Sequence, residues 1–191
     1  MKSIAVLVSG GGSNLGALID AVEQGEINGR IVSVVSSKDG VYALERAKKH
    51  NIPHCVISKK DNPSFDEEMY RHLKDNNVDI IVTAGYLSIL ADKVLTEWSG
   101  RIINVHPSLI PSFCGMGYYG LRVHEEVLKY GVKITGATVH YVTIVVDGGE
   151  IILQKAVDVY PTDTPEVLQK RVMEQAEWEI LPKAVAMLCS T

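Results

Sequence analysis

Several features that mark other protein classes are missing from this sequence. No apolar run in its 191 residues reaches about 18 residues, the length that a membrane-spanning helix needs. The N-terminus enters a predicted strand at once, without the charged segment and apolar stretch of a signal peptide. The formal net charge is −4 and there is no block of lysines and arginines, so neither a nucleic acid nor a membrane is expected as a partner. We therefore expect a soluble, cytoplasmic protein.

Cysteine is also scarce. Cys55, Cys114 and Cys189 are odd in number, far apart and never paired as CxxC. This pattern fits a reducing compartment better than a disulfide framework. Nothing near Cys114 resembles an activating base, so we do not expect a cysteine nucleophile. We expect no metal site among the six histidines either.

The chain does contain an alternation of strand and helix patterns. Short runs rich in valine and isoleucine occupy residues 4–9, 30–37, 53–58, 78–85 and 101–106, and segments with helical spacing lie between the first four, such as 14–25 and 41–51. Strands that alternate with helices favour a parallel sheet covered on both faces. The length is about that of one domain, and no linker or repeat is visible. The sequence thus predicts a doubly wound α/β fold in a single domain, residues 1–191.

The second half changes character. A helical pattern over 121–131 precedes two longer strand patterns, 133–146 and 150–160, on either side of Asp147-Gly148-Gly149. A last helix is predicted to begin near Thr164-Pro165 and to run toward Met187. The mostly parallel sheet should therefore end in a C-terminal β-hairpin and helix.

Two polar residues stand out in the strand pattern GRIINVHPSLIP, residues 100–111. Asn104 and His106 are two positions apart, and a strand points such residues to the same face. Pro107 follows at once and ends the ladder, because it lacks an N–H and has a fixed φ. The pair is either a buried polar pair satisfied by backbone or two functional side chains at a rigid strand exit.

A glycine-rich turn, SGGGSNLGAL, follows the first strand and opens the first helix. The N–H groups of Gly12, Ser13 and Asn14 would point at an anion placed on the helix dipole. Neither GxGxxG nor GKS/GKT is present, so a dinucleotide fold and a P-loop NTPase are not supported. The alternative is a plain turn with Ser13 as N-cap.

Asp147 lies between two strand patterns, where Asp-Gly is first of all a hairpin-turn signal. A carboxylate there could also lean over the ends of the parallel strands, where open α/β sheets bind ligands, and so meet His106. An Asn, a His and an Asp at one edge suit acyl or formyl transfer to an amine. Asn104 and His106 can donate to the oxyanion, and Asp147 can keep His106 charged, orient it or relay the proton.

The chain resembles, over about residues 3–187, the folate-dependent phosphoribosylglycinamide formyltransferases of purine synthesis. The motifs that carry the resemblance are, in order, SGGGSNL, INVHPSLIPSFCGMGYYG, GATVHYV, DGGEIILQ and RVMEQAEWEILP. Asn-x-His-Pro-Ser-Leu-x-Pro is shared with the wider superfamily, including methionyl-tRNA formyltransferase and formyltetrahydrofolate deformylase, which usually carry an extra domain. The resemblance implies a Rossmann-like formyltransferase fold and formyl transfer from 10-formyltetrahydrofolate to the amine of glycinamide ribonucleotide.

The resemblance also implies roles for individual residues. The catalytic group would be Asn104, His106 and Asp147, with His140 in support. Substrate-binding residues would be Gly12, Ser13, Asn14 and Glu177, although Glu177 taken alone reads as a solvated helix carboxylate. Folate-binding residues would be Lys60, Leu87, Ser88, Ile89, Leu90 and Asn104. No metal is implied, and we expect a monomer or a homodimer.

The chain departs from the family on the folate side. Ile144, Val145 and Val146 stand where acidic or polar residues are common, Glu150 stands for a usual Pro, and Met116 for a common Lys. A family Arg is missing around Asn62, with Lys60 as a substitute. Two other readings remain: hydrolysis of formyl-folate by water at the same three residues, and a non-catalytic module that binds a phosphoribosyl ligand.

Overall fold

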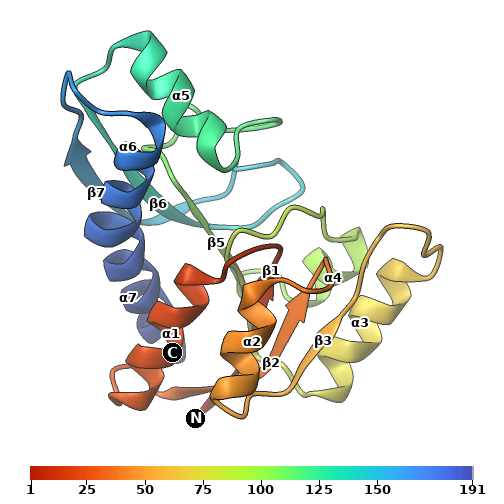
Figure 1. The fold of residues 1–191 in the computed structure, drawn as a ribbon. Coiled ribbons are helices and arrows are strands. Elements are labelled where there is room, and N and C mark those ends of the chain that lie inside the picture. Colours follow the sequence, from red (N-terminus) through yellow and green to blue (C-terminus); the bar gives the residue numbers. More distant parts are fainter. Residues whose placement is uncertain (191) are drawn as a thin grey trace.

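A seven-stranded sheet forms the centre of the protein in the computed structural model, which describes residues 1–190 (Figure 1). The strand order is β3-β2-β1-β4-β5-β6-β7. The strands are β1 (Lys2–Val8), β2 (Gly29–Ser36), β3 (His54–Val56), β4 (Ile80–Thr83), β5 (Ile102–His106), β6 (Ile134–Tyr141) and β7 (Ile151–Asp158). The first five pair in parallel, whereas β6 runs antiparallel to both β5 and β7. The predicted doubly wound, mostly parallel sheet is confirmed.

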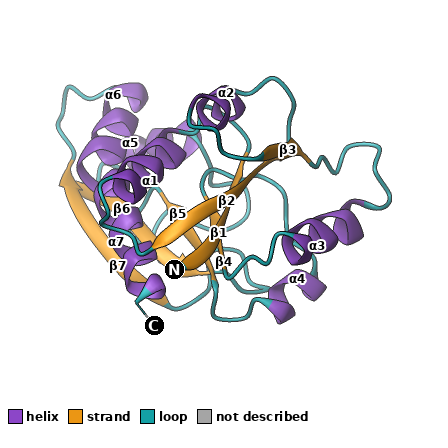
Figure 2. Cartoon of the chain, turned by 90° about the horizontal axis from the view of Figure 1, so that it is seen from below, coloured by secondary structure: helices purple, strands orange, loops and turns teal. Residues whose placement is uncertain are grey.

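Helices cover both faces of this sheet. They are α1 (Ser13–Glu23), α2 (Tyr42–Lys49), α3 (Phe65–Asp75), α4 (Asp92–Glu97), α5 (Leu121–Tyr130), α6 (Pro165–Val172) and α7 (Trp178–Cys189), with a π-helical turn, η1 (Met173–Glu177), between the last two. Alternate residues of β1 face opposite ways: Val6 packs among residues of α1, α2, α6 and α7, whereas Leu7 packs among residues of α3 and α4. Figure 2 shows α1 and α2 on one side of β1 and β2, and α3 and α4 on the other.

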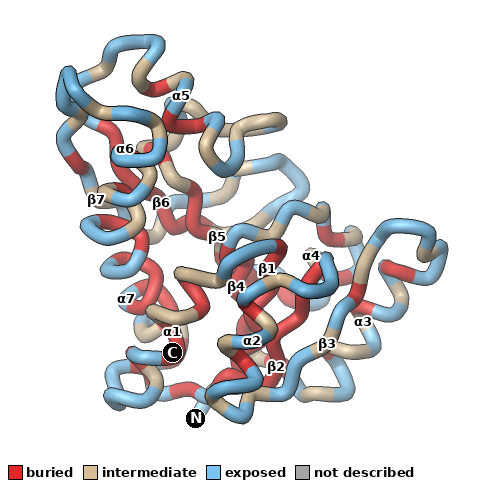
Figure 3. Tube along the Cα trace, viewed as in Figure 1, coloured by how far each residue is buried: buried red, intermediate tan, exposed pale blue. Residues whose placement is uncertain are grey.

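Burial follows this layering. The residues of β1 from Ile4 to Val8, and all of β4, are buried, which explains their near-continuous apolar sequence. In Figure 3 the buried trace runs through the central strands, and the outer turns are exposed. The sheet order reverses direction between β1 and β4, so the loops that follow these strands part at their carboxyl ends. Such a point is where open α/β sheets bind ligands.

One predicted strand boundary is wrong, and with it the predicted turn that follows. The strand predicted over 133–146 ends at Tyr141, and its pairing with β7 ends where His140 faces Ile151. Asp147-Gly148-Gly149 is therefore part of a wide loop, residues 142–150, and not a tight hairpin turn. Gly149 serves a close backbone approach, because a Cβ there would lie 1.8 Å from the carbonyl oxygen of Tyr141.

The predicted C-terminal helix begins as expected and is then interrupted. Thr164 caps it by accepting a hydrogen bond from the Val167 N–H at 3.3 Å, and Pro165 occupies the first turn. The π turn at Met173–Glu177 widens the helix before α7 continues to Cys189. Such turns add a residue to a helical turn and change which side chains face inward.

Candidate active site

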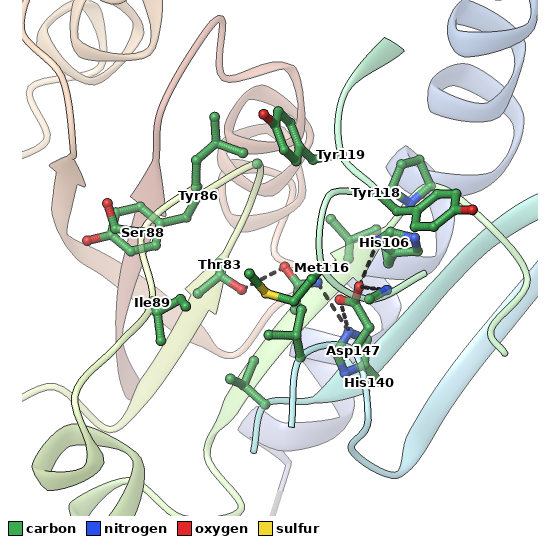
Figure 4. A pocket seen from close by; sticks show the side chains of 18 of the residues that line it. Thr83, Tyr86, Ser88, Ile89, His106, Met116, Tyr118, Tyr119, His140 and Asp147 are labelled. Carbon is green, nitrogen blue, oxygen red and sulfur yellow. Dashed lines mark hydrogen bonds and ion pairs between the residues drawn. The ribbon is translucent and has the colours of Figure 1, made fainter. Parts of the chain in front are cut away.

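A pocket lies over the carboxyl ends of β4 and β5, beside the start of α1. Its cavity volume is about 450 Å³, within the range of small-molecule sites. Its walls include residues from the start of α1, the loop after β4, the end of β5, the loop 142–147 and the π turn. In Figure 4, Thr83 and the Tyr86–Ile89 segment lie on one side, and His106, His140 and Asp147 on the other. The pocket thus joins segments that are far apart in the sequence.

The Asn104 amide is held in one orientation. Its Oδ1 accepts a hydrogen bond from Thr83 Oγ1 at 2.7 Å, which leaves Nδ2 facing His140 Nε2 at 3.2 Å. His140 Nδ1 in turn donates to the backbone oxygen of Tyr141 at 2.9 Å, so its Nε2 accepts from the amide. One of the two amide N–H groups is therefore committed to His140. The other remains available to a ligand in the pocket.

His106 is anchored by its Nε2 atom. This atom donates to the backbone oxygen of Phe113 at 2.9 Å, and Nδ1 faces Asp147 Oδ2 at 3.6 Å. Burial lowers the pKa of His106, and the nearby Asp147 carboxylate only partly offsets that effect. The Asp147 carboxylate therefore favours the charged imidazole, whereas burial opposes it. Asp147 remains able to orient the ring and to stabilise a proton that arrives at Nδ1.

Asp147 is the point where the polar groups converge. Its φ is +54°, a left-handed conformation that Asp tolerates better than most residues. Oδ2 accepts from the Gly115 N–H at 2.8 Å, and Oδ1 lies 3.6 Å from His140 Nε2. Burial, the largest single effect, raises the pKa of the carboxyl, but His140, His106 and the Gly115 N–H together lower it below its ordinary value. Asp147 is thus a carboxylate at neutral pH, between two imidazoles (Figure 4).

The glycine-rich turn lies at another end of the pocket. Gly12 is the N-cap, with φ +68°, and a Cβ there would come within 2.7 Å of Ala43 Cβ, so only glycine fits. The alternative with Ser13 as N-cap is wrong, because Ser13 is the first helical residue and its Oγ points to Met173 Sδ at 3.7 Å. Within residues 1–190 the N–H groups of Gly12, Ser13 and Asn14 have no hydrogen-bond partner.

Glu177 faces Asn14 across the pocket. The carboxylate is almost fully buried and accepts a hydrogen bond from Asn14 Nδ2 at 2.6 Å. Burial raises the pKa of Glu177 to about 6, and the Asn14 bond offsets part of the rise. The reading of Glu177 as a solvated helix carboxylate is therefore wrong. The π turn brings both Met173 and Glu177 to the pocket.

The segment Leu87–Leu90, to which the resemblance assigns folate binding, lines the far side of the pocket. The Leu87 N–H donates to Ser9 Oγ at 2.9 Å, and Ser9 Oγ lies 2.6 Å from Ser37 Oγ, so the segment is fixed to the ends of β1 and β2. Lys60 is not brought to the site: it is exposed in the turn before α3 and is absent from the pocket walls. Gly12 and Ser13 precede Asn14 at the edge of the pocket without lining it.

An apolar rim surrounds the mouth of the pocket, formed by Met116, Ile144, Val145 and Val146. Their exposed fractions are 76%, 79%, 61% and 41%. Apolar side chains gathered in this way on a free surface are typical of an interaction site or a ligand-binding groove. No lysine or arginine is among the residues that line the pocket.

Comparison with known proteins identifies the fold and its family. The family model described as formyl transferase matches residues 2–185. The chain belongs to this formyl transferase family. It is 40% identical to the phosphoribosylglycinamide formyltransferase of Haemophilus influenzae, over 97% of this chain and 86% of that protein. It superposes on the crystal structure of glycinamide ribonucleotide transformylase 1 from Symbiobacterium toebii with a TM-score of 0.93 at 38% identity, covering 100% of this chain and 88% of that one. The resemblance seen in the sequence motifs is confirmed.

Some relatives of this formyl transferase chain are much longer. The trifunctional purine biosynthetic protein adenosine-3 of Drosophila pseudoobscura pseudoobscura is 46% identical over 99% of this chain, which spans 14% of that protein's length. The match therefore concerns one segment of that relative.

Sequence reasoning missed two residues of this formyl transferase site. Thr83 orients the Asn104 amide, and its position as the polar end of the strand pattern IIVT could have revealed it. His124 lines the pocket and is fully buried; neither ring nitrogen has a hydrogen-bond partner within residues 1–190. Burial lowers its pKa to about 4, with a contribution from His106. Its helical spacing from Val127 placed it on the buried face of α5.

Residues 1–190 were also compared with the features of a metal site and of a membrane-spanning helix. Residues 1–190 contain no group of three or more His, Cys, Asp or Glu side chains placed to hold a metal ion. The one HxxxH spacing, His50 and His54, is occupied otherwise: His50 contacts Glu23, and His54 Nδ1 contacts the backbone oxygen of Ile52. None of the helices in these residues has the length and apolar character that a bilayer crossing requires.

Proposed function

We propose that the protein transfers the formyl group of 10-formyltetrahydrofolate to the amine of glycinamide ribonucleotide, a step of purine biosynthesis. One observation carries the proposal: Asn104, His106 and Asp147 converge in a single pocket, with the glycine-rich turn at one edge and an apolar wall at the other end. The family to which the chain belongs and the names of its relatives agree with this reaction.

The glycine-rich end suits the phosphoribosyl part of the substrate. The N–H groups of Gly12, Ser13 and Asn14, which have no partner within residues 1–190, lie at the start of α1, where the helix dipole favours a phosphate. Buried Glu177 would accept hydrogen bonds from ribose hydroxyls, because a carboxylate or carboxyl oxygen there has Asn14 as its only side-chain partner within residues 1–190. The amine would then extend toward Asn104 and His106.

The other end suits the folate co-substrate, which supplies an activated formyl group. Leu87 to Leu90 provide apolar surface and backbone groups for a flat heterocycle, and the apolar rim at Met116 and Ile144–Val146 would cover its aromatic tail. The residues present therefore fit the co-substrate's ring system. They provide no cation within the pocket for its carboxylates.

Three side chains would act on the transfer itself. The amine nitrogen bonds to the formyl carbon, and the free Asn104 N–H would donate to the oxygen as it becomes an oxyanion. Asp147 would draw the amine proton toward the His106 Nδ1 face, where an imidazolium beside the carboxylate also stabilises the oxyanion. The proton then goes to the departing folate nitrogen as its bond to the formyl carbon breaks. His140 and Thr83 would hold Asn104 in place.

One assay tests this function directly. The purified chain is supplied with glycinamide ribonucleotide and 10-formyltetrahydrofolate, and formylated ribonucleotide, tetrahydrofolate and free formate are followed separately. We expect formylated product and tetrahydrofolate in equal amounts, with little formate. Formate that appears without formylated product would favour the hydrolase reading. Binding of the ribonucleotide with no product at all would favour the non-catalytic module.

A further inference from the structure

Arg46, on α2, packs directly against the glycine-rich turn. Its Nε donates to the backbone oxygen of Gly11 at 3.1 Å, and its guanidinium carbon lies 4.9 Å from the centre of the Tyr42 ring. The ring thus supports the guanidinium on one side. Within residues 1–190 the Arg46 side chain forms no other hydrogen bond, so both terminal nitrogens retain their donors. The side chain is only partly exposed.

Two glycines of the turn and helix make room for this side chain. A Cβ at Gly12 would lie 3.6 Å from Arg46 Cδ, besides its collision with Ala43. A Cβ at Gly16 would lie 3.2 Å from Arg46 Nη1, which is closer than most such contacts. Glycine inside a helix costs about 1 kcal/mol relative to alanine. The guanidinium therefore lies over the first turn of α1, close to Gly16.

The contacts with α2 fix the direction of the turn's backbone. The Gly10 oxygen accepts from the Ala43 N–H at 3.2 Å, and the Gly11 oxygen accepts from Arg46. With these two carbonyls turned toward α2, the N–H groups of Gly12, Ser13 and Asn14 are left for a ligand. These donors are neutral, and the lining residues of the pocket include no lysine or arginine. A phosphate with about two negative charges would find no cation among those residues.

We propose that Arg46 is a positioning residue for the substrate phosphate: it holds the Gly11 carbonyl away from the ligand and places a positive charge beside the turn. This inference rests on the proposed function, because it concerns the substrate's phosphate end. Arg46 does not act on the transferring group. Its loss should therefore affect binding of the ribonucleotide and leave turnover at saturation intact.

The test compares Arg46→Met with Lys48→Met, which removes the same charge from an exposed position of the same helix. For each variant, the KM of both substrates and kcat are measured, and the Kd of glycinamide ribonucleotide is obtained by calorimetry without folate. We expect Arg46→Met to raise the KM and Kd for the ribonucleotide about tenfold, the usual effect of losing one charge-assisted contact. The KM for formyl-folate and kcat should stay within about twofold, and Lys48→Met should match the wild type in every constant.

A second variant separates the two parts of the role. Arg46→Lys keeps the charge but lacks the Nε donor, so its ribonucleotide Kd should lie between those of the wild type and Arg46→Met. The inference is overturned if Arg46→Met binds the ribonucleotide as the wild type does, or if both substrates weaken equally. Failure of the wild type itself to bind the ribonucleotide would overturn both this inference and the proposed function. Normal wild-type binding with an unaffected Arg46→Met would overturn this inference alone.

Discussion

Replacement of Glu177 by glutamine tests the most unusual ionisable group of the pocket. The carboxyl is almost fully buried, and burial raises its pKa from 4.5 to about 6. Glutamine has the same shape and keeps an oxygen that can accept the Asn14 Nδ2 hydrogen bond. The substitution therefore removes the ionisation and little else. It should make the folded state more stable at neutral pH.

Proton binding by Glu177 decides how the stability of the folded protein changes with pH. Between about pH 4.5 and pH 6 the folded protein holds a proton on Glu177 that the unfolded chain has lost, so the free energy of unfolding falls as the pH rises through this window. Below pH 4.5 both states are protonated and the effect vanishes. Above pH 6 this fall in the free energy of unfolding is complete, and a difference of 1.5 pKa units corresponds to about 2 kcal/mol. The free energy of unfolding of Glu177→Gln should not fall in this way, because glutamine does not ionise.

Urea unfolding at a series of pH values measures the effect. We expect the variant and the wild type to have equal stability near pH 4 and to differ by about 2 kcal/mol in favour of the variant above pH 7. Glu174→Gln, an exposed carboxylate on the same π turn, is the control for loss of a carboxyl group. A variant of Glu177 that is less stable than the wild type at pH 8 would refute the reasoning. It would mean that the ionised carboxylate is stabilised by the fold.

Further substitutions test the individual contacts of the site. His106→Ala should lower kcat roughly 10²–10⁴-fold in the coupled product assay, whereas His54→Ala, an exposed histidine outside the pocket, should not. Asp147→Asn should lower the His106 pKa further, as measured by NMR titration, and reduce kcat without a matching loss of Tm, because the carboxylate is the larger of the two effects that raise that pKa; normal kcat with an unmoved titration would leave Asp147 with a structural role in the loop 142–150 alone. Gly12→Val should raise the KM of the ribonucleotide and spare that of folate; an equal rise in both would point to misfolding. Thr83→Val should lower kcat about tenfold at unchanged KM, because the Asn104 amide loses the hydrogen bond that fixes its orientation. A change in KM alone would contradict that role of Thr83.

The central part of the site could be predicted because it depends on local periodicity. Asn104 and His106 share a strand face by their spacing, and Pro107 fixes where the strand ends. The glycine-rich turn after β1 follows from composition and from the helix it opens. Both features use only neighbouring residues. They place the site at the carboxyl end of the sheet without any knowledge of the remaining contacts.

The remaining features depend on contacts between distant segments. Residues 144–146 have the β-branched character of a strand, but strand pairing also needs a partner, and β7 pairs with β6 only as far as His140. The burial of Glu177 depends on a π turn that no local pattern predicted. Arg46 reaches the glycine-rich turn only because α2 packs beside α1. Such arrangements follow from the packing of whole elements, which sequence spacing does not specify.

The apolar rim of the pocket has a thermodynamic consequence. Met116, Ile144, Val145 and Val146 keep much of their surface in water in the free protein. A co-substrate that covers them releases that hydration water, and the burial of apolar surface makes the heat capacity of binding negative. The enthalpy of folate binding should accordingly become more favourable with rising temperature while the entropy becomes less so, and the affinity itself should change little over the physiological range.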